Sequence, residues 1–484
     1  MQKKFLGNLL FIILLNLIIK PFYIFGIDVQ VQNIVGSEAY GLYFALLNIS
    51  LLFNIFLDAG ITNFNTKNTA QHPKVLTNYL GSYYGTKLIL TVPYIVLTVG
   101  FALIIGYNKL ELYLLGFLIF NQILSGFTIY MRSNFAGLHL FKVDALLSIL
   151  DRLFLIVIIG AFIYGNVSDE PIKIEWFVYA QTISYGLTVL IGLILTKTLI
   201  GNFKVKLKKI FSIAILKQSF PFALLILLTM VYTRIDAIML ERMLPNGKEQ
   251  AGVYAQVFRL LDALNMFAFL VAGILLPIFA RMIANKESVK PILQIAGKLL
   301  IGIAIITSIG LAINAELTIS TIYTNHIESS TQAFQWLIFC FIPLSISHVF
   351  STLLTANNNL KFLNIIALSG IVLNIILNRI LIPSMEAEGA AIATLITQSF
   401  AALAQLILVL FIFKFKVQWR VIYKFISLII LSYFTSWYLM VNYSNLWSFL
   451  VTFGVGLLFL FLLKLINIKD ILALVRIKEN PKDE

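Results

Sequence analysis

Several basic side chains of this chain lie inside apolar segments, where they could attract an anion. They are Lys20, Lys87, Arg152, Arg234, Arg259 and Arg379. An ionisable group within a bilayer costs at least ~2.5 kcal/mol, so such groups usually face a bundle interior or a wet cavity. The pattern therefore predicts a membrane-embedded, anion-attracting path.

Buried carboxylates accompany these cations and could take part in ion coupling. Asp144 and Asp151 are seven residues apart, hence on one face of a helix, whereas Arg152 points about 100° away. Two like charges at close range disfavour full ionisation, so this pair could hold a coupling proton. Alternatively, Asp144 could lie at a wet inner mouth. Both readings remain open from the residues alone.

Two further pairs of opposite charge lie in neighbouring apolar segments. Arg234 and Asp236 are two residues apart, on nearly opposite faces of a helix, which favours partners on other helices. Arg259 and Asp262 are three apart and could pair with each other, which would make them purely structural.

No cofactor or metal site can be read from the sequence. The four histidines are scattered without ligand spacing, and the single cysteine excludes an intramolecular disulfide. The stretch Gly81–Lys87 lacks the spacing of a nucleotide-binding loop. We therefore expect no cofactor and no metal.

The composition identifies a polytopic membrane protein. The chain has 484 residues, of which 60% are hydrophobic and 12% are charged. Its net charge of +14 comes mainly from short loops between apolar segments. Lysine and arginine there set the topology and meet anionic lipid head groups, so we expect membrane lipids as partners and no nucleic acid.

Hydropathy predicts an all-α protein with about 14 transmembrane helices. The expected spans are 8–28, 40–61, 79–107, 111–131, 143–165, 176–197, 217–243, 252–281, 295–323, 333–356, 361–382, 388–413, 421–441 and 446–466. The first is expected to be a retained helix rather than a cleaved signal peptide, because it has no small-residue cleavage site.

The charges of the loops predict that both termini are cytoplasmic. With this orientation, the outer loops and span ends contain only a few basic residues, namely Lys109, Lys173, Arg242 and Lys248. Such an asymmetry is the usual signal of membrane topology.

An internal duplication is visible in two stretches. Ile27-Asp28, Gly41-Leu42-Tyr43 and Ala59-Gly60-Ile61 correspond to Ile235-Asp236, Gly252-Val253-Tyr254 and Ala272-Gly273-Ile274. Duplication with buried charge is typical of transporters built from repeats. The expected organisation is two pseudo-symmetric six-helix lobes, 1–200 and 217–413, a basic cytoplasmic linker 201–216, an additional helix pair 414–466 and a cytoplasmic tail 467–484.

The stretches RIDAIML, GVYAQVFRLLDAL and LLPIFARM, with VGSEAYGLYFALLNISLLFNIFLDAGITNF near the N-terminus, resemble the Wzx-type O-antigen and polysaccharide flippases. This family belongs to the multidrug/oligosaccharidyl-lipid/polysaccharide superfamily. The resemblance implies two lobes around an alternately opening cavity in the bacterial inner membrane. It also implies an undecaprenyl-diphosphate-linked oligosaccharide as cargo, with other polysaccharide-assembly membrane proteins as partners.

The resemblance also suggests roles for individual residues. Spans one, seven and eight line the cavity in this superfamily, so Lys20, Arg234 and Arg259 are expected to attract the diphosphate, with Arg152 as a fourth cation. Lys87 is a candidate for substrate access. The candidates for coupling are Asp144, Asp151, Asp236 and Asp262.

Three other functions are weighed against a flippase. A cation-coupled multidrug exporter of the same superfamily would need an acid-dominated cavity, whereas several basic groups lie in these spans. A polymerase or ligase of surface polysaccharide would need a large outer loop, and no loop exceeds roughly twenty residues. A structural scaffold would give no reason for so many buried charges. We therefore expect a transporter, not an enzyme.

Overall fold

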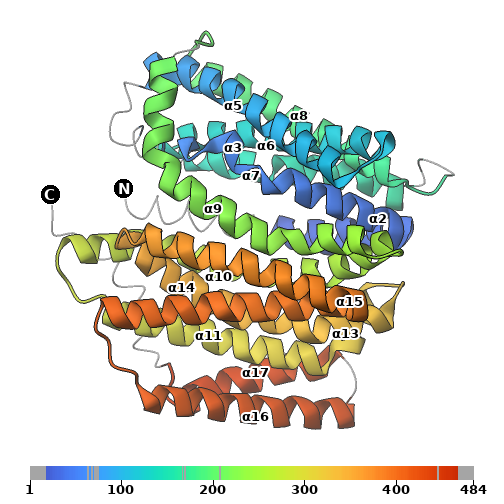
Figure 1. Ribbon diagram of the computed structural model, residues 1–484, viewed down its shortest axis with the longest axis vertical. Coiled ribbons are helices and arrows are strands. Elements are labelled where there is room, and N and C mark those ends of the chain that lie inside the picture. The colour runs from blue at the N-terminus through green and yellow to red at the C-terminus, as the bar shows by residue number, and fades with distance from the viewer. Residues whose placement is uncertain are drawn as a thin grey trace. The chain divides into compact units, whose positions relative to one another are not determined.

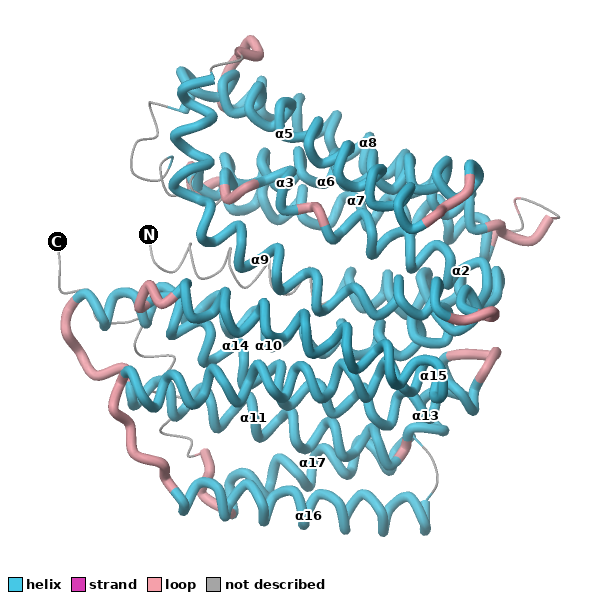
Figure 2. Tube along the Cα trace, viewed as in Figure 1, coloured by secondary structure: helices cyan, strands magenta, loops and turns pink. Residues whose placement is uncertain are grey.

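The computed structural model describes residues 18–62, 65–66, 69, 76–165, 167, 170–206, 209–443 and 446–466, and side chains throughout these except in 209–222 and 446–449. The predicted tail 467–484, the start of the first span and residues 207–208 of the predicted linker lie outside the described residues. Every regular element in the described part is helical, as Figure 2 shows.

The chain divides into two compact units, Met1–Gly252 and Val253–Glu484. The elements of the first unit are η1 (Ile24–Asp28), α2 (Val29–Leu52), α3 (Ile55–Asp58), α5 (Leu76–Ile105), α6 (Lys109–Gly137), α7 (Phe141–Tyr164), α8 (Ile174–Leu199) and α9 (Lys209–Met243). Helix α10 (Gly247–Ala284) begins in the first unit and continues into the second.

The second unit contains the remaining helices, whose ribbon is drawn in yellow to red in Figure 1. They are α11 (Lys290–Ile313), α12 (Ala315–Ile322), α13 (Ile327–Leu337), η3 (Ile338–Cys340), α14 (Phe341–Ala356), α15 (Leu360–Ile412), α16 (Trp419–Tyr443) and α17 (Leu446–Leu462). The last two pack on each other and on α11, in agreement with an additional helix pair after the second repeat.

The predicted all-α fold of many membrane spans is confirmed. Eleven helices of the described part are long and apolar enough to cross a membrane, and Leu450–Leu462 is a shorter apolar helix. Two of the eleven each contain a residue with non-helical backbone angles, Gly36 (φ 81°) and Glu386 (φ 51°). These breaks fall between predicted spans one and two and between spans eleven and twelve.

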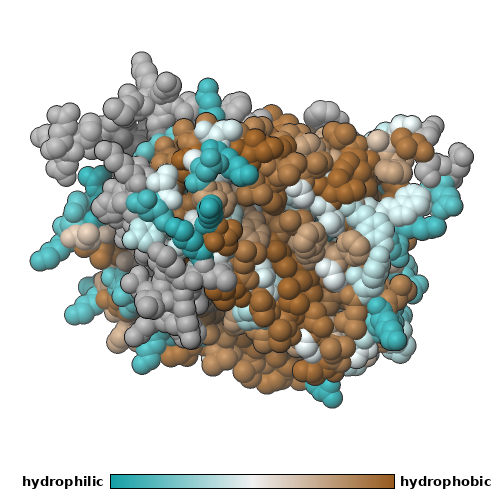
Figure 3. Space-filling model, turned by 90° about the horizontal axis from the view of Figure 1, so that it is seen from above, coloured by the Kyte–Doolittle hydropathy of each residue, from teal (hydrophilic) through white to brown (hydrophobic). Residues whose placement is uncertain are grey.

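Apolar side chains cover much of the outside of the protein. Large hydrophobic residues such as Ile104, Leu110 and Phe411 are strongly exposed, as lipid-facing residues are. In the face seen in Figure 3, apolar side chains cover the middle and hydrophilic ones gather toward the edges. The interior of each unit, by contrast, contains many buried polar groups, for which hydrocarbon offers no hydrogen-bond partners.

The start of the predicted basic linker is attached to α5. The ring of Phe203 stacks on that of Tyr84, with centroids 4.5 Å apart, and the Lys206 amide donates to the Gly81 carbonyl at 2.9 Å. A Cβ on Gly81 would lie 1.9 Å from the Lys204 carbonyl oxygen, so only glycine permits this approach. Lys204 and Lys206 are exposed beside this attachment.

Candidate functional site

Arg152 lies on α7 among two aromatic rings and a carboxylate. Its guanidinium carbon is 5.2 Å from the ring centre of Tyr23 and 6.0 Å from that of Tyr185. Nη1 donates to the Tyr185 hydroxyl at 3.2 Å and to the carboxylate of the adjacent Asp151. Neighbouring residues of a helix leave it about 100° apart, yet the side chains of Arg152 and Asp151 still pair.

A second arginine pairs with the other carboxylate of α7. Nε of Arg132, near the end of α6, donates to Oδ1 of Asp144 at 2.7 Å. The two carboxylates of α7 thus each have an arginine, Asp144 with Arg132 and Asp151 with Arg152. A coupling role for Asp144 and Asp151 stays a prediction, now with an arginine beside each carboxylate.

Lys20 belongs to the same group of charges. It is half-buried in the helix Ile18–Leu52, three residues before Tyr23, whose ring Arg152 contacts, and the charges of Arg152, Arg132 and Asp151 act on it. We call Lys20, Arg132, Asp144, Asp151 and Arg152 the basic cluster. Three cations against two carboxylates leave this cluster a formal charge of +1. The arginine side chains are 33% and 31% exposed and the carboxylates 15% and 17%, so the accessible part of the cluster is mainly cationic. Such a surface can receive an anion.

Lys87 has a different environment, although it also lies in a membrane span. Its ammonium group donates to the carboxylate of Asp58 at 2.8 Å and to the carbonyls of Leu57 at 3.2 Å and Gly126 at 3.1 Å. These contacts use all three of its N–H donors. The side chain is only 3% exposed, and the small space beside it is too narrow for a water molecule. In this conformation Lys87 joins α3, α5 and α6.

The other predicted cations lie on different helices. Arg234 is half-buried on α9 in the first unit, whereas Asp236, two residues on, is fully buried, in agreement with opposite helix faces. Arg259 and Asp262 are half-buried on the part of α10 that belongs to the second unit. Arg379 is exposed on α15. The structure thus brings Lys20 and Arg152 together, and it adds Arg132.

A polar cluster that the sequence analysis missed lies where α5 meets α6 and α9 meets α10. We call it the corner cluster: Tyr107, Glu111, Glu241, Arg242 and Lys248. Glu111 pairs with Lys248 at 2.9 Å and with Arg242 at 3.3 Å, and Arg242 also pairs with Glu241 at 2.8 Å. The Asn108-x-x-Glu111 spacing, a capping-box signature, was the one local signal of it.

Tyr107 completes the corner cluster. Its hydroxyl donates to Glu241 at 2.8 Å, and the Arg242 guanidinium lies 3.5 Å from its ring centre. Burial raises the pKa of the Tyr107 phenol well above its ordinary value, and the neighbouring Glu241 carboxylate raises it further. The phenol therefore stays protonated and remains a donor to Glu241 at physiological pH.

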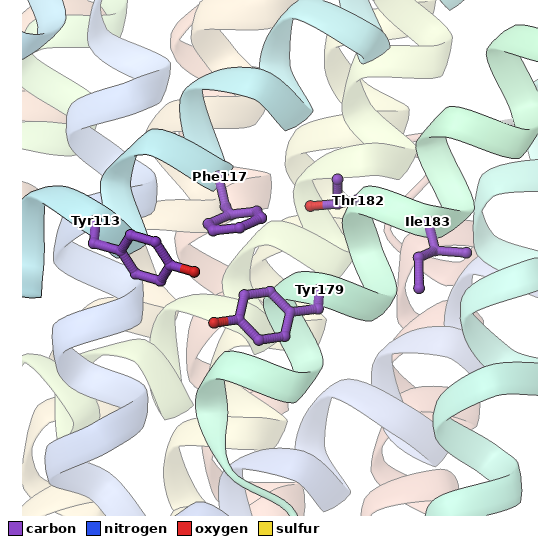
Figure 4. A pocket seen from close by; sticks show the side chains of 5 residues that line it. All are labelled: Tyr113, Phe117, Tyr179, Thr182 and Ile183. Atoms are coloured by element: carbon purple, nitrogen blue, oxygen red, sulfur yellow. The ribbon is translucent and has the colours of Figure 1, made fainter.

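An aromatic cleft of about 360 Å³ opens between α6 and α8. Figure 4 shows the hydroxyl ends of Tyr113 and Tyr179 pointing toward one another, with Phe117 beside them and Thr182 and Ile183 farther along. Tyrosines are typical of the interface between membrane and water. No predicted site residue lines this cleft, and no group of three or more potential metal ligands occurs among the described residues.

Comparison with solved structures defines the fold as that of a membrane transporter. The structure matches the "Lipid II flippase MurJ, inward closed conformation", with a TM-score of 0.70 and 14% identity over 95% of this chain and 97% of that one. It also matches an inward-facing multidrug resistance MATE family transporter of the MOP superfamily, with a TM-score of 0.60 and 14% identity over 79% and 92% of the two chains. A MOP superfamily transporter from Pyrococcus furiosus gives a TM-score of 0.59 at 14% identity, over 84% and 94%.

The family of polysaccharide biosynthesis proteins matches residues 5–283, which is more than half of the sequence. The chain belongs to this family. No curated protein matches it. The resemblance that the sequence motifs suggested is thereby confirmed.

Proposed function

We propose that the protein is a flippase for an undecaprenyl-diphosphate-linked oligosaccharide. The cargo would be an O-antigen (lipopolysaccharide) unit or another surface-polysaccharide repeat unit. It would move from the cytoplasmic to the periplasmic leaflet of a bacterial inner membrane by alternating access. The polysaccharide family and the fold shared with a lipid II flippase support this cargo class. Both termini would be cytoplasmic, and the protein would act as a transporter without enzymatic activity.

The observation that carries the proposal is the cluster of Lys20, Arg132 and Arg152. A diphosphate has several acceptor oxygens, and guanidinium groups bind such oxygens through charge-assisted hydrogen bonds. The carboxylates of the cluster moderate its positive charge, which favours release as well as capture. Arg234 and Arg259 are proposed as further diphosphate-attracting cations, and Asp236 and Asp262 as coupling groups.

A cation-coupled multidrug exporter is the second candidate, because MATE transporters share the fold. A cavity for organic cations should be dominated by acidic groups, whereas cations outnumber carboxylates in the basic cluster. Membrane lipids and other polysaccharide-assembly membrane proteins would be its partners as a flippase.

The test is flipping by the purified protein in liposomes that contain a labelled undecaprenyl-diphosphate oligosaccharide. We expect the parent protein to flip it and the double variant Lys20→Ala/Arg259→Ala to lose this activity. Lys173→Ala is the matched control, because it removes an exposed lysine whose described contacts are the Glu170 carboxylate and the ring of Trp176, neither of which belongs to the basic cluster. Extrusion of an organic cation without flipping would favour the exporter.

A further inference from the structure

Two glycines bring the backbones of α2 and α10 into direct contact. A Cβ on Gly41 would lie 1.8 Å from the Lys248 carbonyl oxygen, and one on Gly252 would lie 2.0 Å from the Ser37 carbonyl oxygen. Real side chains cannot occupy such distances, so both positions require glycine. Gln32 adds a hydrogen bond from Nε2 to the Gly252 carbonyl at 2.9 Å. All these residues belong to the first compact unit.

The two glycines occupy equivalent positions in the duplicated motif. Gly41 belongs to Gly41-Leu42-Tyr43 and Gly252 to Gly252-Val253-Tyr254. Each repeat therefore contributes one glycine, and each glycine receives the backbone of the opposite repeat. In transporters built from repeats, access alternates when one repeat rocks against the other. When one repeat moves against the other, a contact between equivalent positions of the two repeats would form or separate in a single step.

Lys248 connects this contact with the corner cluster. Its carbonyl oxygen lies against Gly41, while its ammonium group pairs with Glu111 on α6. The side chains of Lys248 and Arg242 are 38% and 27% exposed, so water can replace their partners when the pairs separate. The ion pairs therefore hold the α9–α10 corner against α6, while their cations remain partly exposed to water.

We propose that the Gly41–Gly252 contact and the corner cluster together form a latch. The latch holds one side of the transporter closed, the side that the loop charges predict to be the outer one, and it separates when that side opens. This inference rests on the proposed function only in that the protein alternates its access. It does not depend on which cargo is moved.

The test measures opening directly, without any cargo. Cys340 is replaced by serine, and Ser37→Cys, a position 4% exposed in the contact, serves as the reporter. The full chain is reconstituted in lipid vesicles, and a membrane-impermeant maleimide is added to either side. We expect slow labelling in the parent and labelling at least about fivefold faster after Glu111→Gln, which removes the carboxylate charge from two ion pairs.

Matched variants separate opening from unfolding. Lys248→Arg keeps the charge and should label as slowly as the parent. Glu170→Gln weakens the exposed pair with Lys173 and should also leave the rate unchanged. A second reporter, Ala145→Cys, lies in the core of the first unit and should stay protected throughout.

The outcomes distinguish this inference from the proposed function. An unchanged Ser37→Cys rate in Glu111→Gln would overturn the latch, even if flipping is observed in the liposome assay. Faster labelling of both reporters would also overturn it, since that indicates unfolding. Faster labelling of Ser37→Cys alone supports the latch, even if the cargo is a different lipid-linked molecule.

Discussion

Lys87 and Arg152 are both cations in membrane spans of the first unit, yet their surroundings differ. Lys87 is 3% exposed, and three protein oxygens take all its donors. Arg152 is 31% exposed, and its described hydrogen bonds from the guanidinium use one nitrogen, so donors remain for a further acceptor. The comparison teaches that donor saturation, more than depth in the membrane, separates a structural cation from one that can bind an anion.

The largest expected effect is a loss of stability on substitution of Lys87, whose N–H donors are all used. Lys87→Met should destabilise the protein by about 3–5 kcal/mol, because it leaves the Asp58 carboxylate without its charge partner. Thermal unfolding in detergent measures this loss. The double variant Lys87→Met/Asp58→Asn should recover part of it. A parent-like unfolding temperature for Lys87→Met would show that the saturated contacts are not structural.

Adding a methyl group at the glycine contact should have the next largest effect on stability. Gly41→Ala should cost about 1–3 kcal/mol, because its Cβ would overlap the Lys248 carbonyl and force α2 and α10 apart. Gly100→Ala on α5 is the matched control, because nothing lies within 4 Å of its added Cβ. Equal unfolding temperatures for the two variants would contradict the tight contact.

Substitution of Arg152, the cation with donors left for a further acceptor, should affect transport more than stability. Arg152→Ala should slow flipping at least about tenfold, or ~1.4 kcal/mol, because it removes a phosphate donor. Arg379→Ala, which removes an exposed arginine of α15, should flip at the parent rate. Undiminished flipping by Arg152→Ala would remove Arg152 from the binding site and weaken the comparison with Lys87.

The smallest effect is expected at a solvated ion pair. Lys173 and Glu170 are 59% and 65% exposed and pair at 2.9 Å. Lys173→Ala should change the free energy of unfolding by at most about 1 kcal/mol, since water screens such pairs. A loss of unfolding free energy as large as that of Lys87→Met would mean that the exposure of a cation does not predict its contribution to stability.

The sequence predicted the helices well because the relevant signals are local. Runs of apolar residues placed the spans, and the expected breaks coincide with the non-helical residues Gly36 and Glu386. The internal duplication was also readable, because Gly41 and Gly252 stand in matching motifs. The motif could not reveal that Gly41 packs against the backbone of α10 and Gly252 against the backbone of α2.

The partners of the charges could not be predicted, because they come from other helices. Asp144 appeared to share a face with Asp151, but its partner Arg132 approaches from α6. Glu111 and Arg242 meet across 131 residues of sequence. Helical periodicity gives the face on which a charge lies, whereas the packing of helices decides what that charge meets.

The α9–α10 corner also bears on how the protein enters the membrane. The segment from Glu241 to Glu249 contains two acidic and two basic residues, Glu241, Glu249, Arg242 and Lys248, so its formal charge is zero. In the predicted topology this hairpin is carried to the outer side during insertion. Moving one net charge against the membrane potential costs about 2.3 kcal/mol per 100 mV. The hairpin would therefore cross with little electrical work, although it contains two of the few outward cations, Arg242 and Lys248. Both cations pair with Glu111 of α6, so these ion pairs form only once the helices have packed.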